Sequence, residues 1–237
     1  MATPDVATTN TRTHEISLLL LQHNGASFFV VQNTFLVGLG PSDLVVGDLN
    51  NDTLPDLVTA NFSSSDVSVL IGRRADNAFT FEPEQRYDVG ARPRAVTVAD
   101  VNNDGNLDIL TANSSPVNNI TILIGQGDGT FPFLRLKQDL QAGEEPIDLA
   151  VGDLNDDGFL DLVTVNNGSD DVSILLGQGD ALFGPERQFP VGRRPRQVII
   201  ADFNANDKLD VATANGGTDN VSVLLGLGDG TLLVEQG

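Results

Sequence analysis

The chain alternates short hydrophobic runs with polar, glycine-rich segments, and this pattern recurs along most of its length. Four similar segments, DLNNDTLPDLVTAN, DVNNDGNLDILTAN, DLNDDGFLDLVTVN and DFNANDKLDVATAN, begin at Asp48, Asp100, Asp153 and Asp202. Their starting points lie 52, 53 and 49 residues apart. Because a fixed period of about 20 to 50 residues is the signature of repeat architectures, the chain is predicted to be an array of similar units.

Each unit contains four short runs that favour β-strands. A proline stands seven residues before each leading aspartate, and an apolar run such as AVTVAD lies between them. The second run is of the LDILTAN type, and the third reads VSVLIG, ITILIG, VSILLG or VSVLLG, beginning at Val67, Ile120, Val172 and Val221. Glycine-rich turns and a looser fourth run follow. Valine, isoleucine and threonine dominate, and apolar positions alternate or form short runs, so the pattern indicates strands and not helices.

Four antiparallel strands per repeat predict an all-β chain folded as a β-propeller of four-stranded blades, with a stacked solenoid as the alternative. The segments Asp5–Asn10 and Ile16–Leu20 match the last unit at a constant offset of 205 residues, so the N-terminal region is predicted to be a partial blade. The whole chain is expected to be one domain, with the partial blade at 1–40 and complete blades at about 41–92, 93–145, 146–194 and 195–237. Either the ring is truncated or a partner completes it.

The nine-residue stretch between the first two strands of each complete unit carries the chemistry. Side-chain oxygens stand at positions 1, 3, 5 and 9, and a backbone carbonyl at position 7 would add another ligand. Calcium takes six to eight oxygen ligands, which a tight loop can point inward together. The sequence therefore predicts up to four Ca²⁺ ions, one per loop, with these candidate ligands: Asp48, Asn50, Asp52, Leu54 and Asp56; Asp100, Asn102, Asp104, Asn106 and Asp108; Asp153, Asn155, Asp157, Phe159 and Asp161; Asp202, Asn204, Asn206, Lys208 and Asp210.

The four loops are not equivalent. Position 6 is Gly105 or Gly158 in the second and third loops but Thr53 in the first, where a left-handed backbone would cost strain. The fourth loop has Asn206 at position 5 and Asp207 at position 6. The alternative reading is that such loops form Asx turns without an ion. Against it, the crowded carboxylates would repel one another unless a cation compensated them.

Composition narrows the functions further. The formal net charge is −20 and there is no cysteine, which argues against nucleic acid or an anionic membrane as partner and excludes disulfides and thiolate zinc sites. No apolar run is long enough to span a membrane, and no signal peptide is visible. The two histidines, His14 and His23, have no repeated acidic or serine partner nearby, so the chain is expected not to be an enzyme.

The motif DVNNDGNLDILTAN, followed by VSILLGQGDALF and recurring about every fifty residues, resembles the FG-GAP or VCBS repeats of bacterial surface proteins and the integrin α-subunit propeller. The resemblance implies calcium in the loop between the first two strands, a propeller usually of seven blades, and a role in adhesion or in protein or carbohydrate binding. It also implies an extracellular or cell-surface location. The chain differs from the family in blade number.

Strands alternate in direction, so the face opposite the calcium loops is predicted to be free for a protein or carbohydrate ligand. That face would carry Asn-rich turns and an arginine cluster suited to carboxylates or sulfated sugars, the alternative being a solvated rim. The arginines are Arg92, Arg94, Arg193, Arg194 and Arg196, and the turns lie at Asn61, Asn113, Asn118, Asn167 and Asn220. Glycosylation sequons occur at Asn61, Asn113, Asn119, Asn167 and Asn220. Three functions fit the sequence: an adhesion or protein-binding module, a lectin, and a domain of a larger secreted enzyme. A second copy of the chain is a further candidate partner, because it could complete the ring.

Overall fold

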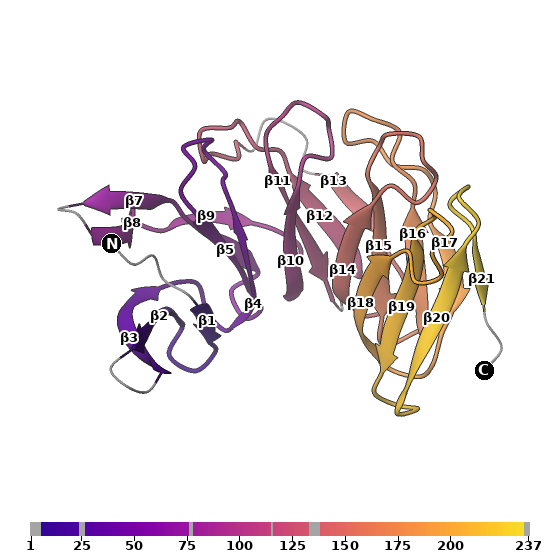
Figure 1. Cartoon of the computed structure of the whole chain (residues 1–237), viewed down its shortest axis with the longest axis horizontal. Coiled ribbons are helices and arrows are strands. Elements are labelled where there is room, and N and C mark those ends of the chain that lie inside the picture. The colour runs from indigo at the N-terminus through magenta and orange to yellow at the C-terminus, as the bar shows by residue number, and fades with distance from the viewer. Residues whose placement is uncertain (1–5, 24–26, 76–77, 115, 133–137, 235–237) are drawn as a thin grey trace.

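The computed structural model describes residues 6–23, 27–75, 78–114, 116–132 and 138–234 as an all-β fold. The strands form antiparallel sheets that fan around an arc, as blades of a propeller do (Figure 1). The fold-class prediction is confirmed. In the described part of the chain, no helix is long and apolar enough to cross a membrane.

The N-terminal sheet has three strands, in the order β1 (Val6–Asn10), β2 (Glu15–His23) and β3 (Ser27–Leu36). Strands β1 and β2 correspond to the second and third strands of a complete blade, as the sequence offset predicts. Residues 1–5, which include Asp5 of the predicted segment, lie outside the described residues.

Four sheets of four strands follow, and in each the strands neighbour one another in chain order. The first blade contains β4 (Pro41–Gly47), β5 (Asp56–Asn61), β6 (Asp66–Leu70) and β9 (Gln85–Asp88). The second contains β10 (Pro93–Ala99), β11 (Asp108–Asn113), β12 (Asn119–Leu123) and β13 (Gln138–Gln141). The third contains β14 (Pro146–Gly152), β15 (Asp161–Asn166), β16 (Asp171–Leu175) and β17 (Arg187–Pro190). The fourth contains β18 (Pro195–Ala201), β19 (Asp210–Asn215), β20 (Asn220–Gly226) and β21 (Leu232–Val234).

One element departs from the repeat. The turn between the third and fourth strands of the first blade, RRADNAF, extends into a separate hairpin of β7 (Gly72–Ala75) and β8 (Ala78–Phe81). Phe79 and Phe81 of this hairpin pack edge to face, and Phe81 meets Phe35 in the same way. The repeat pattern predicts a turn at this place in each blade and gives no sign of an added hairpin, because RRADNAF lacks the glycines of the other turns and occurs only once.

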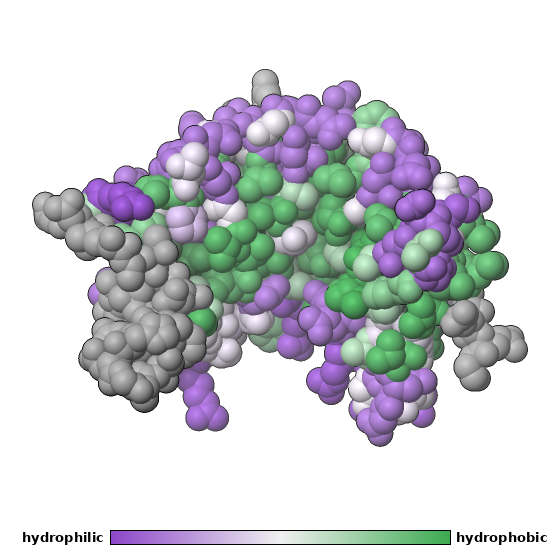
Figure 2. All heavy atoms as spheres, viewed as in Figure 1, coloured by the Kyte–Doolittle hydropathy of each residue, from purple (hydrophilic) through white to green (hydrophobic). Residues whose placement is uncertain are grey.

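The core consists of layers between neighbouring sheets. We call the two sides of each sheet the leading face, which carries Val58 and Val67 in the first blade, and the trailing face, which carries Leu57 and Leu70. The leading face of each of the first three blades packs against the trailing face of the next blade, and the N-terminal sheet packs on the trailing face of the first blade through Ile16 and Leu18. This explains why β5 and β6 are buried at every residue, since a sheet covered on both faces needs continuous apolar strands. Hydrophobic residues gather across the middle of the arc in Figure 2, between hydrophilic rims.

The leading face of the fourth blade is open. Val221 is 64% exposed, whereas the equivalent residues Val67, Ile120 and Val172 are fully buried. Ile199 of the same face is 53% exposed, and a shallow groove runs between these two side chains. The arc of described blades therefore ends in an exposed apolar surface, whereas the corresponding surface of each of the first three blades is covered by the next blade.

Candidate metal loops and the opposite face

Each nine-residue loop connects the first two strands of a complete blade, and its side chains turn inward on the loop. In the second loop the backbone N–H of Asp104 donates to both Asp100 Oδ1 and Asn102 Oδ1, at 3.0 Å each. Gly105 N donates to Asp100 Oδ2 at 2.8 Å, and Asn102 Nδ2 donates to Asp104 Oδ2 at 3.0 Å. The side chains at positions 1, 3 and 5 are thus brought together by a shared set of backbone donors.

The first and third loops repeat this pattern. Asp52 N donates to Asp48 Oδ1 and to Asn50 Oδ1, at 3.0 and 3.2 Å. Asp157 N donates to Asp153 Oδ1 and Asn155 Oδ1, both at 3.2 Å. In all four loops the backbone N–H of position 7 donates to the side chain at position 5, and the position-7 residues are Leu54, Asn106, Phe159 and Lys208. The position-7 side chains take no part in these hydrogen bonds within the loop.

The ninth position joins the loop to the rest of the blade. Asp108 is fully buried, and its carboxylate accepts hydrogen bonds from Val101 N at 3.0 Å and Gly125 N at 2.9 Å. Asp56, Asp161 and Asp210 are equally buried and make the same two bonds. This residue therefore pins the start of the loop to the end of the third strand.

Burial perturbs the pKa of the position-9 carboxylate in the first three loops. Desolvation raises the pKa of Asp108 to about 6 and that of Asp161 to about 6, against the lowering effect of their backbone hydrogen bonds, and the carboxylates at positions 1 and 5 raise it further. The pKa of Asp56 is raised for the same reasons. Each loop thus concentrates negative charge that a nearby cation would offset.

Backbone angles account for the residue types in the loops. Position 6 is left-handed throughout, with φ of 86° at Gly105, 87° at Gly158, 70° at Thr53 and 63° at Asp207. Position 4 is left-handed as well, at Asn51, Asn103, Asp156 and Ala205. The strain expected at Thr53 is therefore present. A second strained residue, Ala205 in the fourth loop, was missed because the sequence pattern drew attention only to the glycine position.

The fourth loop differs in its side chains. Asn206 N and Asp207 N donate to Asp202, as in the other loops, at 3.1 and 2.8 Å. Lys208 Nζ donates to the carbonyl of Leu227 at 2.6 Å, so the ammonium group is bound to the neighbouring turn. Of the candidate ligands, Asn204 makes no side-chain hydrogen bond within the described residues.

The side-chain oxygens of the loops are of the type that calcium binds, but not every side chain is oriented as a ligand in this structure. Among the described residues, no three carboxylate or imidazole groups converge closely enough to form a metal cluster as they stand. In the second loop, Asn102 presents its amide nitrogen to Asp104, so binding a cation there requires this amide to turn its oxygen inward. Loop positions 1, 5 and 9 retain carboxylate lone pairs beyond those used by the backbone.

Neighbouring loops touch along one rim of the arc. Asn51 Nδ2 donates to Asn106 Oδ1 of the next loop at 3.0 Å, and Gly129 N of the next blade's turn donates to Leu49 O at 3.1 Å. The loops and the turns between the third and fourth strands therefore share one face, as the alternation of strand direction predicts.

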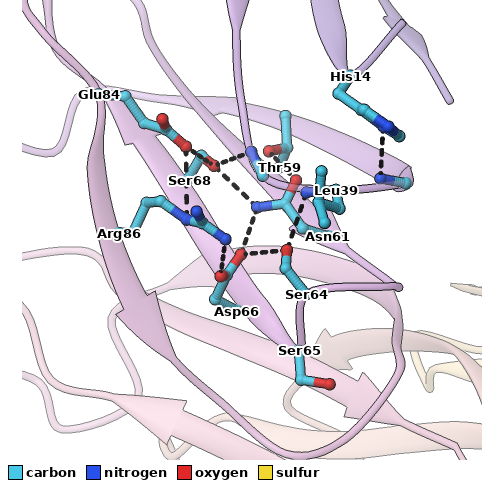
Figure 3. Close-up of polar contacts among 12 residues, drawn as sticks. His14, Leu39, Thr59, Asn61, Ser64, Ser65, Asp66, Ser68, Glu84 and Arg86 are labelled. Carbon is cyan, nitrogen blue, oxygen red and sulfur yellow. Dashed lines mark hydrogen bonds and ion pairs between the residues drawn. The ribbon is translucent and has the colours of Figure 1, made fainter. Parts of the chain in front are cut away.

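A buried polar network lies at the other end of the second strand (Figure 3). Asn61 accepts from Thr59 Oγ1 at 3.0 Å and donates from Nδ2 to Asp66 Oδ1 and Ser68 Oγ, both at 2.8 Å. Asp66 also pairs with Arg86. Asn113, Asn166 and Asn215 occupy the same place in the other blades. A Cβ on Gly38 would lie 2.4 Å from the amide nitrogen of Asn61, which explains the glycine that precedes each first strand.

This network corrects the sequence interpretation of the asparagines. Asn61 and Asn113 were expected in open turns on the ligand face and as sequon residues, but both are fully buried with their amides bonded, and Asn119 is 7% exposed. The folded chain cannot present these three amides for glycosylation. Asn220 is exposed, Asn167 is partly exposed and donates to Pro195 O, and Asn118 accepts from Glu145 N.

His14 is also part of the framework. Its Nδ1 accepts a hydrogen bond from Gly40 N at 3.0 Å (Figure 3), so it holds the N-terminal sheet to the start of the first blade. The side chain of His23 lies outside the described residues.

The arginines predicted for the opposite face do gather there. Arg92, Arg94 and Arg196 line an open cavity of about 370 Å³, together with Phe62 and Glu145. Arg193 and Arg194 line an adjoining cavity of about 390 Å³ that shares Glu145 and Arg196. The structure thus assembles these five residues from two separate connections between blades.

Comparison with solved structures supports the fold. A functionally unknown protein from Desulfotomaculum acetoxidans DSM 771 matches with a TM-score of 0.65 and 13% identity, over 97% of this chain and 65% of that one. A "putative 6-phosphogluconolactonase" from Bacteroides uniformis ATCC 8492 matches with a TM-score of 0.70 and 16% identity, over 99% and 70%. A Lactobacillus plantarum protein matches with a TM-score of 0.65 and 15% identity, over 96% and 64%. The chain thus spans about two thirds of the length of these structures.

Comparison of sequences identifies the family. No curated protein gave a significant match. The family described as FG-GAP-like repeat matches three overlapping stretches, residues 48–111, 100–164 and 153–213. These stretches contain all four nine-residue loops and cover well over half of the sequence. The chain therefore belongs to the FG-GAP-like repeat family.

Proposed function

We propose that the chain is a calcium-binding β-propeller module of the extracellular space or cell surface. In this proposal it binds a protein or carbohydrate ligand, in an adhesive role, on the face opposite the loops, and has no catalytic activity of its own. The observation that carries the proposal is an oxygen-rich loop that recurs in all four complete blades, and whose first, third and fifth side chains meet around a shared backbone donor in the first three. In the second and third loops, desolvation and then the carboxylates at positions 1 and 5 raise the pKa of the buried carboxylate at position 9, so a bound cation would offset the cost of ionising it.

The second and third loops are the best candidates. In each, Asp at positions 1, 5 and 9 and Asn at position 3 supply oxygens, and glycine takes the left-handed position 6 without strain. Calcium would supply the positive charge that offsets these carboxylates and would fix the loop to the strands on both sides of it. The first loop carries the strain of Thr53, and the fourth has one carboxylate fewer, so we expect both to bind more weakly.

Isothermal titration calorimetry with Ca²⁺ tests the proposal, and thermal unfolding with and without chelator gives a second readout. The double variants D100N/D104N and D153N/D157N each remove two charges while keeping one side-chain oxygen per residue that can accept a loop hydrogen bond, as Asn206 does in the fourth loop. Each should lower the number of bound ions by one and reduce the rise in melting temperature that calcium produces.

The control is D88N, which removes one charge from an exposed strand residue outside the loops. It should bind as many ions as the wild-type chain. A wild-type chain that shows neither binding heat nor a shift in melting temperature at millimolar calcium would overturn the proposal. Magnesium should bind less tightly, because it holds its waters and demands stricter octahedral geometry.

Two alternatives are separable by experiment. A lectin would bind neutral or charged glycans on an array, and a domain of a larger secreted enzyme would show no ligand of its own. The solvent-open face with its arginines favours direct ligand binding over the second alternative.

A further inference from the structure

We propose that the two adjoining cavities on the face opposite the loops bind an acidic oligosaccharide through its carboxylate or sulfate groups. The inference deepens the proposed function, since it names the ligand class for that face, but it depends on none of the calcium ligands. The residues that carry it are Phe62, Arg92, Arg94, Glu145 and Arg196, with Arg193 and Arg194 in the second cavity.

The arginines of the first cavity are positioned by packing, without acidic partners. The guanidinium carbon of Arg94 lies 4.3 Å from the centre of the Phe62 ring, and that of Arg92 lies 5.8 Å from it. Such stacking holds the guanidinium plane while leaving its N–H edge free to bind an anion. Within the described residues, ion pairs are found only at Arg86, so none of the cavity arginines is neutralised by a carboxylate.

Arg196 is positioned from the other side. A Cβ added to Gly216 would lie 2.5 Å from Arg196 Nε, so the arginine side chain passes directly over this glycine. Two other polar side chains that line the first cavity already donate to backbone carbonyls: Asn167 Nδ2 donates to Pro195 O, and Ser114 Oγ donates to Arg92 O. The unpaired donors that face a ligand are therefore the guanidinium groups.

The local charge is opposite in sign to that of the whole chain. The two cavities together present five arginines against two carboxylates, Glu145 and Asp170, on a chain whose formal net charge is −20. Five of the thirteen basic residues thus lie on one small part of one face. An anion is attracted to this patch and repelled by most of the remaining surface, which favours selective docking there.

The form of the cavities favours a sugar over a peptide. Both are open and polar, and they lie side by side with Glu145 and Arg196 on the shared boundary. Acidic sugars carry their charges on rigid rings at regular intervals, which suits two neighbouring hollows lined with planar, bidentate donors.

Binding can be measured by fluorescence anisotropy with labelled oligogalacturonate as the carboxylate probe and labelled heparin oligosaccharide as the sulfate probe. Labelled neutral dextran and poly-glutamate serve as comparison ligands. The wild-type chain should bind at least one acidic oligosaccharide, with affinity that falls as salt rises, and should not bind dextran. The double variant R94Q/R196Q should lose at least tenfold in affinity.

Two variants sharpen the test. R74Q removes one positive charge from the exposed hairpin β7–β8, outside the lining of both cavities, and should leave affinity within twofold of wild type. E145Q removes the carboxylate shared by both cavities and should raise affinity for the anion two- to fivefold. A fall in affinity for the acidic probes on E145Q would show that Glu145 contributes to binding them and would contradict the electrostatic argument.

The outcome also separates this inference from the calcium proposal. If the double loop variants lose calcium but keep oligosaccharide affinity, both proposals stand. If the wild type binds calcium but neither acidic probe, or if R74Q weakens binding as much as R94Q/R196Q, the ligand inference fails and the calcium proposal is untouched. Tighter binding of poly-glutamate than of either sugar would assign the site to an acidic peptide and overturn the sugar assignment.

Discussion

A left-handed backbone at position 6 of every loop makes the residue there a direct determinant of loop strain. A β-branched residue such as Thr53 is disfavoured at φ of 70°, whereas glycine adopts the equivalent angle freely. The space around the position is not limiting, because a Cβ on Gly105 or Gly158 would have no heavy atom within 4 Å. The cost at Thr53 is therefore one of conformation alone.

Thr53→Gly should consequently stabilise the chain. Relief of left-handed strain should stabilise the folded chain by on the order of 1–3 kcal/mol. The greater conformational entropy of glycine in the unfolded chain offsets part of this gain. A net gain of about 1 kcal/mol corresponds to a rise of roughly 2–4 °C in melting temperature for a chain of this size. The reciprocal change, G105T, should lower the melting temperature by at least as much.

Differential scanning calorimetry with calcium at a fixed concentration measures both variants. The control is T13G, which replaces an exposed threonine that does not have a positive φ and should be neutral or slightly destabilising. A T53G chain that melts at or below the wild-type temperature would show that the first loop is not strained in solution.

At the scale of elements, partly buried carboxylates link the first strands of neighbouring blades. Asp43 Oδ2 in β4 accepts from Val96 N in β10, and Asp148 Oδ2 in β14 accepts from Val198 N in β18, both at 2.9 Å. The corresponding position of β10 is Ala95, which has no acceptor to offer the third blade. These links therefore occur at alternate blade junctions only.

Partial burial of these two acids predicts a pH dependence. Desolvation raises the pKa of Asp148 to about 6, despite the hydrogen bonds from Val198 and Leu149 that lower it, and the charge of Asp43 adds to the rise. The pKa of Asp43 is raised for the same main reason. Since the folded-state pKa exceeds the unfolded value, the folded chain holds the proton more tightly. The contribution of Asp148 to stability is thus fully present below about pH 4 and is lost as pH rises to about 6 and beyond.

Asp148→Asn should remove this dependence while keeping an oxygen that accepts from Val198 N. At pH 7.5 the variant should be at least as stable as the wild type, by up to about 2 kcal/mol, and the difference should shrink as the pH falls to 5. Urea unfolding at both pH values measures the difference, in which any contribution from the loops cancels. If D148N were less stable than wild type at pH 7.5, the ionised carboxylate would be stabilising and the sign of the pKa shift would be wrong.

How far the sequence predicts this molecule also differs by element. The first three strands of each blade could be located because the motif repeats and because sheets covered on both faces need continuous apolar runs. The hairpin β7–β8 could not, since it occurs once and its packing partner Phe35 is distant in sequence. The buried role of Asn61 was likewise hidden, because an asparagine before a polar turn has the same local pattern whether its amide faces solvent or Ser68.

At the scale of the whole molecule, the leading face is open in the fourth blade and covered in the third, so equivalent residues of these two blades should contribute differently to stability. Val172 in β16 is fully buried against the fourth blade, whereas Val221, its counterpart in β20, is 64% exposed. V172D would bury a carboxylate without a partner and should cost more than 4 kcal/mol or prevent folding, while V221D should change stability by less than about 0.5 kcal/mol.

The milder pair V172A and V221A keeps the comparison measurable if V172D does not fold, with an expected loss of about 2 kcal/mol for V172A alone. Urea unfolding combined with size-exclusion chromatography distinguishes the two surfaces. Equal losses at both positions, accompanied by a later elution of V221D than of wild type, would mean that another copy covers the fourth blade in solution, and that the face is part of an interface between chains.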